Sequence, residues 1–189
     1  MWAFRRERLC LVALPLIGCA PVAMLRPPGV LGDDRSFEAG AAVASLGSRP
    51  YVEEPRTYTG QAWFTADVRR WLSLSGVAAF DTSAAAVGVA ARWNGLRTQR
   101  VTVGPELELG YAWAAASLGA SARVFGRNYV YTAPRFGNIG SHWALGFPAG
   151  VSVDLTHGFA LRAEAQLSWQ ELQNYNRRLH LAAGLAYQF

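Results

Sequence analysis

The chain has 189 residues, of which 51% are hydrophobic and 12% aromatic, and its formal net charge at neutral pH is +5. About 170 residues remain once an N-terminal export segment is removed, which suits one domain rather than two. No run of 18 apolar residues follows that segment, so we expect no transmembrane helix. The excess of positive charge is small, and no basic run is interleaved with aromatic residues. The composition therefore argues against a nucleic-acid partner.

The first residues have the form of a bacterial export signal. Three arginines within the first eight residues precede the apolar stretch 9–17, which is too short to span a membrane. The residues Leu16-Ile17-Gly18-Cys19 then resemble the lipobox of bacterial lipoproteins. This resemblance implies that cleavage follows Gly18 and that Cys19 is acylated as the mature N-terminus. Cleavage after Ala23 of an ordinary signal peptide is the alternative.

We therefore divide the chain into a signal peptide at 1–18, a lipidated N-terminal tether at 19–35 and a β-barrel at 36–189. The tether assignment follows from its mixture of proline, glycine and charge, which has no period. Cys10 leaves with the leader and Cys19 is consumed by lipid, so no thiol pair remains for a disulfide, a metal or redox chemistry. We expect no metal site and no cofactor. The residue after Cys19 is Ala20, whereas an Asp at this position would resemble an inner-membrane retention signal. The sequence therefore favours the outer membrane.

From Ser36 onward apolar residues alternate with polar or small residues, which predicts β-strands with one apolar face. Four polar stretches are expected to be loops and three short ones turns. The expected strands cover 36–46, 58–68, 72–80, 85–93, 101–113, 117–131, 143–155, 159–169 and 179–189, the loops 48–56, 94–98, 132–141 and 170–177, and the turns 69–70, 114–116 and 156–158.

Nine strands conflict with parity, because a bacterial barrel with both termini in the periplasm has an even number of strands. The number of wall strands becomes even if residues 72–93 form one long strand kinked at 81–83, or if residues 36–46 lie outside the wall. We favour the first arrangement, because it makes 48–56 an outer loop and Arg69-Arg70 a tight periplasmic turn. Either arrangement gives an all-β fold, an eight-stranded antiparallel up-and-down transmembrane β-barrel.

The last eleven residues carry the most specific signal. One face holds Leu185, Tyr187 and Phe189, and the opposite face holds only small or polar residues. This strand resembles the terminal signal strand of bacterial outer-membrane β-barrels, whose final Phe is recognised by the barrel-insertion machinery. The resemblance implies an outer-membrane barrel similar to OmpA and OmpX. A soluble β-sandwich remains the alternative for any single strand.

Aromatic residues gather near the expected strand ends, as two interfacial girdles require. We place Trp71, Trp113, Phe159, Tyr187 and Phe189 near the periplasmic ends, and Trp93, Trp143 and Trp169 near the outer ends.

An eight-stranded barrel is filled by its side chains, so charged residues that point inward should pair there. Glu106 and Glu108 are expected to lie across the 114–116 turn from Arg123. The complete expected network in the lumen is Glu106, Glu108, Arg123, Asp154, Arg162, Glu164 and His180. We interpret it as a plug of salt bridges that closes the barrel. A proton or ion path is the alternative.

Ser168 is expected beside His180, with Glu164 close by, which is similar to a nucleophilic set. Barrel enzymes that deacylate lipid A carry a Ser two residues after a His. Here the residues two beyond His142, His157 and His180 are Ala144, Phe159 and Ala182, so the motif is absent. We predict no catalytic residue.

The sequence thus favours a non-enzymatic barrel lipoprotein with a structural or scaffolding role in an envelope-spanning assembly. Its expected partners are outer-membrane lipids and lipopolysaccharide, which arginines in the outer loops would contact, together with the barrel-insertion machinery and other envelope proteins. A lipid-modifying enzyme of the lipid A deacylase type and a small channel are the alternatives.

Overall fold

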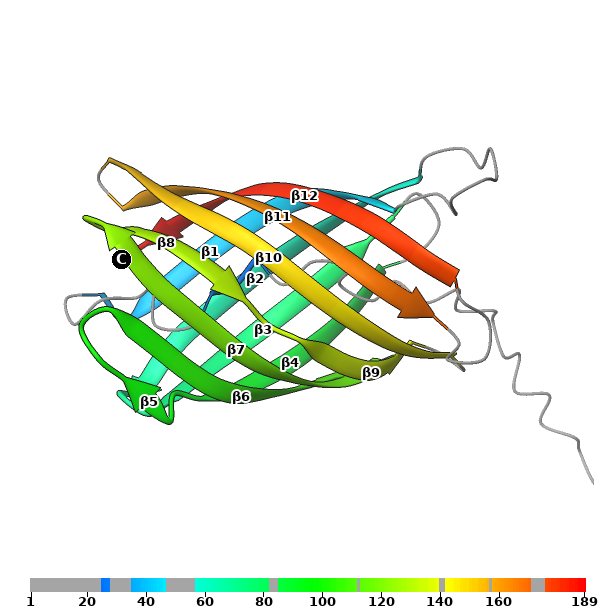
Figure 1. Cartoon of the computed structure of the whole chain (residues 1–189), viewed down its shortest axis with the longest axis horizontal. Coiled ribbons are helices and arrows are strands. Elements are labelled where there is room, and N and C mark those ends of the chain that lie inside the picture. The colour runs from blue at the N-terminus through cyan, green and yellow to red at the C-terminus, as the bar shows by residue number, and fades with distance from the viewer. Residues whose placement is uncertain are drawn as a thin grey trace, which may run out of the picture.

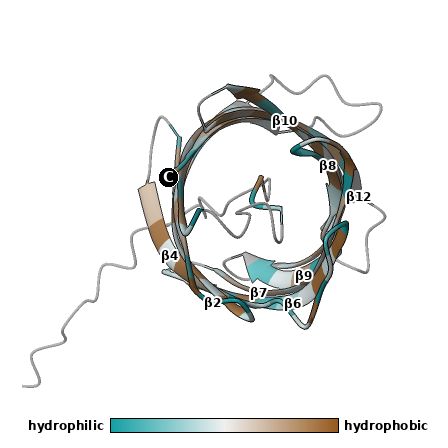
Figure 2. Cartoon of the chain, turned by 90° about the vertical axis from the view of Figure 1, so that its left-hand side faces the viewer, coloured by the Kyte–Doolittle hydropathy of each residue, from teal (hydrophilic) through white to brown (hydrophobic). Residues whose placement is uncertain are grey.

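The alternation of apolar and polar residues closes the chain into an antiparallel β-barrel, seen from the side in Figure 1 and along its axis in Figure 2. The computed structural model describes residues 25–27, 35–46, 57–81, 85–111, 113–139, 142–156, 158–170 and 176–189. Within these ranges no helix is long and apolar enough to cross a membrane. The strands are β1 (Phe37–Leu46), β2 (Thr57–Arg69), β3 (Leu72–Phe80), β4 (Ala85–Trp93), β5 (Leu96–Arg97), β6 (Val101–Gly110), β7 (Trp113–Phe125), β8 (Asn128–Thr132), β9 (Arg135–Ile139), β10 (His142–Thr156), β11 (Phe159–Gln170) and β12 (Asn176–Gln188).

Ten strands form the wall, and pairing of β1 with β12 closes it. The strands β8 and β9 both lie between β7 and β10, so together they occupy one position. The two-residue strand β5 pairs with β6 beyond the point where β4 pairs with it, so it only extends that position. Counting β8 and β9 as one strand and leaving out β5 reduces the twelve strands to ten positions in the wall. The predicted closed antiparallel barrel is confirmed, and the predicted number of eight strands is wrong.

Two expected long strands are in fact hairpins. Residues 72–93 form β3 and β4, which pair with each other from Leu72 with Trp93 to Phe80 with Ala85. The expected strand 117–131 reverses at Gly126. Gly126 has a φ of 57°, a left-handed backbone conformation that residues with a side chain rarely adopt and that this turn requires. The expected loop 132–141 contains β9. Residues 36–46 do form a wall strand, as the favoured arrangement required.

The corrected count changes which turns share an end of the barrel. We call the end that carries Arg35 and Phe189 the terminal rim and the opposite end the far rim. The expected turn at 114–116 lies inside β7, because three consecutive alanines pair with β6 as readily as any strand residue. Residues 94–98, expected on the outer side, lie at the terminal rim, where the Asn94 amide donates to the Trp71 carbonyl at 2.9 Å.

The polarity of the barrel is the reverse of that of a soluble domain. On β12, Leu181 and Leu185 expose more than half of their side-chain surface, whereas His180 is buried in the lumen. The same alternation runs through the wall, with large apolar residues exposed outside and Ser, Thr, Gln, Glu and Arg buried inside. An apolar exterior around a polar interior is the arrangement of a transmembrane barrel.

Aromatic residues mark both rims on the outer surface. At the terminal rim the ring of Phe189 stacks on Phe37 and on Tyr187, each at 5.7 Å between centroids. Near the far rim Phe136 stacks on Trp143 at 5.0 Å. Two expected positions are corrected by the strand count: Trp93 lies exposed at the terminal rim, and Trp113 is buried inside the wall near the far rim.

Candidate functional site in the barrel lumen

Part of the N-terminal segment lies inside the barrel. Leu25, Arg26 and Pro27 are buried, and their contacts come from inward-facing side chains of the wall. Arg35, which precedes β1, lies at the terminal rim, where it donates to the Gln188 amide oxygen at 3.1 Å. Residues 19–35 were predicted to be a tether; of the part that the structure describes, residues 25–27 lie in the lumen and Arg35 lies at the terminal rim.

Three hydrogen bonds hold the backbone of this segment. The Leu25 amide donates to Glu164 Oε2 at 2.9 Å, and the Leu25 carbonyl accepts from Arg162. The Arg26 carbonyl accepts from Arg92 at 2.6 Å. Leu25 has a φ of 43°, a left-handed conformation that a residue with a side chain keeps only when its surroundings enforce it. The wall therefore fixes the path of the segment through charged hydrogen bonds.

The Leu25 side chain fills an apolar pocket in the lumen. Its surface is fully buried, and the pocket is formed by side chains of β1, β2 and β12: Ala42, Ala44, Trp63, Ala182 and Ala186. Four of these five residues are alanines, which leave room for a leucine inside a narrow barrel. The pocket is the main apolar patch that the described lumen contributes to this segment.

The Arg26 side chain reaches across to β6. One of its terminal nitrogens donates to Glu106 Oε1 at 3.1 Å and, more closely, to Glu108 Oε2. Burial lowers the pKa of the Arg26 guanidinium, but the two carboxylates outweigh this effect and raise that pKa above its ordinary value. Arg26 therefore stays cationic between the two glutamates.

Both glutamates have further cationic partners in the wall. Glu106 forms an ion pair with Arg92, and Glu108 accepts from Arg135 at 2.8 Å and from the Trp113 indole nitrogen. Glu106 and Glu108 thus connect the N-terminal segment to β4, β7 and β9. This connection explains why Trp113 lies inside the barrel rather than in an aromatic girdle.

A second buried cluster is centred on Glu38 of β1. Arg162 donates to both oxygens of this carboxylate, at 2.7 Å to Oε1. The carboxylate also accepts from the Trp63 indole nitrogen at 2.8 Å and from the Gln188 amide at 3.0 Å. Because Arg162 also donates to the Leu25 carbonyl, the segment is linked to both clusters.

The ionisable side chains of these two clusters balance in charge. The cations are Arg26, Arg92, Arg135 and Arg162, and the anions are Glu38, Glu106, Glu108 and Glu164. Four positive charges against four negative charges give a net charge of zero. Without Arg26 these two clusters would hold three cations and four anions, so the N-terminal segment supplies the charge that balances them.

The structure brings together only part of the predicted network. Glu106, Glu108, Arg162 and Glu164 belong to the clusters around the N-terminal segment. Arg123 does not pair with the two glutamates as expected, since it is exposed at the terminal rim and donates to the Tyr129 hydroxyl at 3.0 Å.

The other two predicted members lie apart from the segment. Asp154 is half-buried, and its backbone amide donates to Asn128 Oδ1 at 2.9 Å. His180 Nε2 lies 2.7 Å from Ser168 Oγ, as the expected pairing of β11 with β12 implied. Among the residues that the structure describes, no group of three His, Cys, Asp or Glu side chains is placed to hold a metal ion.

Sequence reasoning missed half of the charged residues in the clusters. Glu38 and Arg92 stand at inward positions of correctly predicted strands, so the alternation itself contained the signal. Arg135 was missed because its strand was taken for a loop. Arg26 gave no signal at all, because a short non-periodic segment has no pattern that points to a lumen.

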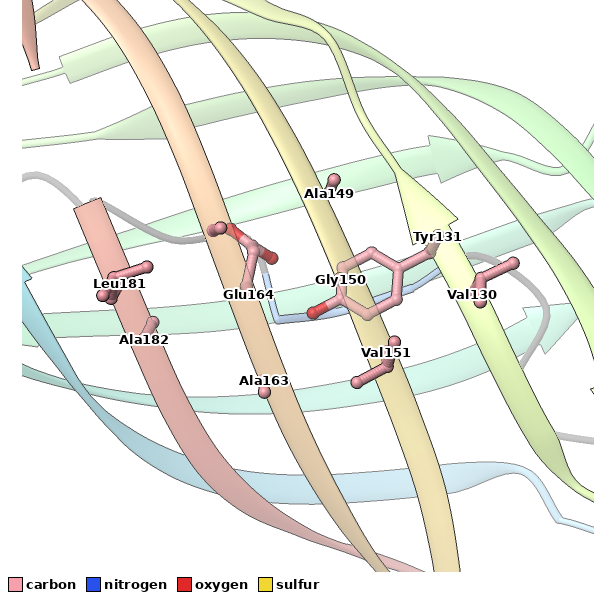
Figure 3. Close-up of a pocket in the computed structure, with 10 residues that line it drawn as sticks. Val130, Tyr131, Ala149, Gly150, Val151, Ala163, Glu164, Leu181 and Ala182 are labelled. Carbon is pink, nitrogen blue, oxygen red and sulfur yellow. The ribbon is translucent and has the colours of Figure 1, made fainter. Parts of the chain in front are cut away.

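A hollow of about 600 Å³ lies in the wall beside this site, where β8, β10, β11 and β12 are adjacent (Figure 3). Tyr131 lies over Gly150 with its hydroxyl toward Glu164. A Cβ at Gly150 would stand 2.3 Å from the Tyr131 ring, so glycine is required for this close approach. Glu164 is thus approached by the Leu25 amide and by the Tyr131 side chain.

Comparison with known proteins supports the architecture. No family model matches the chain, and no curated protein sequence matches it. The β domain of the Bordetella autotransporter BrkA has a TM-score of 0.51 at 13% identity, covering 82% of this chain and all of that domain. The fold is that of the outer-membrane β-barrels.

Two further solved structures are more distant. Ail of Yersinia pestis, an attachment invasion locus protein, has a TM-score of 0.41 at 12% identity and covers 82% of this chain and 97% of its own. A loop deletion mutant of OmpT, an outer membrane protein of Vibrio cholerae, has a TM-score of 0.42 at 11% identity and covers 92% and 71%.

Proposed function

We propose that the protein is a closed, non-enzymatic β-barrel of the Gram-negative outer membrane that holds its own N-terminal segment in its lumen. The observation that carries this proposal is the anchoring of Leu25 and Arg26 by three backbone hydrogen bonds and two carboxylates. A segment bound this way fills the space through which ions would pass. It also ties whatever precedes it to the barrel, which suits a structural or scaffolding component of the envelope.

The outer-membrane location is supported by the apolar exterior and by the aromatic residues at both rims. The lipid anchor rests on the lipobox at Cys19, which lies outside the described residues. A barrel is held in the membrane without acyl chains, so lipidation would be redundant for anchorage alone. We infer that an acylated N-terminus serves the scaffolding role by contacting another envelope component.

The Ser168–His180 pair is the observation that favours an enzyme. Both side chains are buried in the lumen, and His180 also hydrogen-bonds the backbone of Ser45. These bonds join β11, β12 and β1 on the inner face of the wall, whereas an acyl ester in the bilayer would approach the outer face. We therefore assign the pair a structural role in joining the three strands.

Planar-bilayer recordings test the closed state. The full-length protein should give no stable conductance steps, whereas Arg26→Gln should give them, because the substitution removes the cation that holds the segment between Glu106 and Glu108. Arg35→Gln is the matched control, since Arg35 belongs to the same segment but donates to Gln188 at the terminal rim, away from Glu106 and Glu108. Stable conductance through the unmodified protein would contradict the proposal.

The enzymatic alternative is tested separately. Purified protein is incubated with lipopolysaccharide, and the mass of lipid A is followed by mass spectrometry. If the unmodified protein removes an acyl chain from lipid A and the variants Ser168→Ala and His180→Gln do not, the protein is an enzyme and the structural assignment of the pair is wrong. An unchanged lipid A mass is the expected result.

A further inference from the structure

We propose that the lumen is a binding site for an extended peptide in which an apolar residue is followed by arginine. In this chain Leu25 and Arg26 occupy it, and a segment of the same chemistry from another protein can replace them. The inference rests on the proposed function, because it takes the segment in the lumen as the natural occupant. It adds a class of partner that the barrel would recognise.

Three contacts of the site bind the peptide backbone and do not depend on the occupant's side chains. Glu164 accepts from the amide of the first residue, Arg162 donates to its carbonyl, and Arg92 donates to the carbonyl of the second. All three wall side chains are almost fully buried, and each is charged. Charged hydrogen bonds to backbone groups bind any peptide in this conformation, so they supply affinity without sequence preference.

Two adjoining features of the wall supply the preference. The pocket of four alanines and Trp63 accepts an apolar side chain of leucine size at the first position. Glu106 and Glu108 lie two residues apart on the inner face of β6, and both contact one guanidinium nitrogen at the second position. A pair of carboxylates favours arginine, whose planar group offers several donors.

The charge count makes this site selective for a cation. Within the two clusters the wall contributes three arginines and four glutamates, an excess of one negative charge that the occupant balances. A neutral peptide would leave a buried carboxylate without full compensation, which is costly in a closed lumen. The occupant must therefore bring one positive charge at its second residue.

None of these contacts depends on the occupant being part of the same chain. The hydrogen bonds and the apolar pocket would be the same for a separate peptide. The covalent link to the barrel raises the local concentration of the resident segment. A competing segment can therefore displace it when the resident segment is weakened or the competitor is abundant.

The experiment uses the full-length protein in detergent or nanodiscs. In Arg26→Gln the resident segment loses its cation, and a fluorescent peptide acetyl-Val-Ala-Leu-Arg-Pro-amide is titrated by anisotropy. The control peptide carries citrulline in place of arginine, which keeps the shape and removes the charge. We expect saturable binding of the arginine peptide, at least tenfold tighter than binding of the citrulline peptide. Adding Glu108→Gln to the same variant should weaken arginine-peptide binding by about tenfold or more.

Equal binding of the two peptides, or no binding, would overturn the inference. That failure is distinct from failure of the proposed function, since the conductance of Arg26→Gln is measured without any peptide. If Arg26→Gln does not assemble, Arg26→Lys is used instead, because it keeps the charge but lacks the guanidinium. The same tenfold preference for the arginine peptide is then required, and its absence would again overturn the inference.

Discussion

Arg162 on β11 and Glu38 on β1, which lie 124 positions apart in the chain, form a buried ion pair in which both carboxylate oxygens accept hydrogen bonds. Arg162 has no exposed surface, and Glu38 is 3% exposed. Paired charges in a low-dielectric interior are tolerated because each satisfies the other, whereas one alone is not. The pair therefore links the first strand of the barrel to a strand near its end through the same arginine that holds the Leu25 carbonyl.

Glu38→Gln should lower the free energy of unfolding by about 3 to 5 kcal/mol, since it leaves the Arg162 charge buried without its carboxylate. The measurement is urea unfolding of the full-length protein in lipid vesicles. Glu38→Leu combined with Arg162→Met is the matched control, and it should be much less destabilising because no charge remains unpaired. A loss below about 1 kcal/mol for Glu38→Gln would contradict the assigned burial of the pair.

Gly40→Ala should destabilise the barrel by about 1 to 3 kcal/mol through overpacking. A Cβ at Gly40 would lie 2.1 Å from the Trp63 ring, which cannot move away without losing its hydrogen bond to Glu38. Gly76→Ala is the control, because no atom lies within 4 Å of its added Cβ. It should be neutral or stabilising by up to about 1 kcal/mol. Equal effects in urea unfolding would remove Trp63 from its assigned place.

The alternation in the sequence was sufficient for the class of fold and for the inner and outer faces of most strands. It failed at two reversals. The alternation does break at Asp81 to Ser83, but parity favoured treating that break as a kink within one strand, whereas β3 and β4 pair as a hairpin. The turn at Gly126 leaves no break in the alternation, which therefore predicts a continuous strand there. Each error removed a strand from the count, which is why an even number was reached at eight instead of ten.

The candidate site was predictable only on its wall side. Glu106, Glu108, Arg162 and Glu164 follow from the alternation of β6 and β11, because a charge at an inward position must find a partner. Their partner Arg26 could not be found in this way. It belongs to a segment held by backbone groups and one guanidinium, and neither produces a periodic pattern.

Cys19 should carry a lipid, as the lipobox predicts, although it lies outside the described residues. Mass spectrometry of the mature N-terminal peptide should show a diacylglyceryl group on Cys19, and Cys19→Ser should abolish that mass and the processing behind Gly18. An unmodified N-terminus at Met24 would show instead that an ordinary signal peptidase cleaves the chain.

Deletion of Phe189 should reduce the amount of assembled, heat-modifiable barrel. The Phe189 amide and carbonyl bond the backbone of Phe37 at 3.0 Å each, so the deletion removes both bonds and an aromatic stack at the closing seam. Tyr111→Ala removes an exposed aromatic at the far rim and should leave assembly unchanged, as should Glu171→Ala. The readout is the shift between folded and heat-denatured bands on gels, and an undiminished folded band would show that the seam forms without Phe189.

Two positions on opposite faces of β12, Leu185 and His180, separate the lipid-facing side from the lumen. Leu185 is 53% exposed on the outer face, so Leu185→Arg should cost about 2 to 4 kcal/mol if the position lies at the bilayer midplane. His180 is buried and bonded to Ser168 and to the Ser45 backbone, so His180→Ala should cost about 1 to 3 kcal/mol, the order of the penalty for buried polar groups left unsatisfied, and the barrel should still assemble. Both values come from urea unfolding in vesicles, with the folded gel band as a second readout. Normal assembly of Leu185→Arg together with failure of His180→Ala would exchange the two faces of the strand, and the lumenal site would then be wrong as well, because Glu164 and Arg162 share the face of His180 through the pairing of β11 with β12.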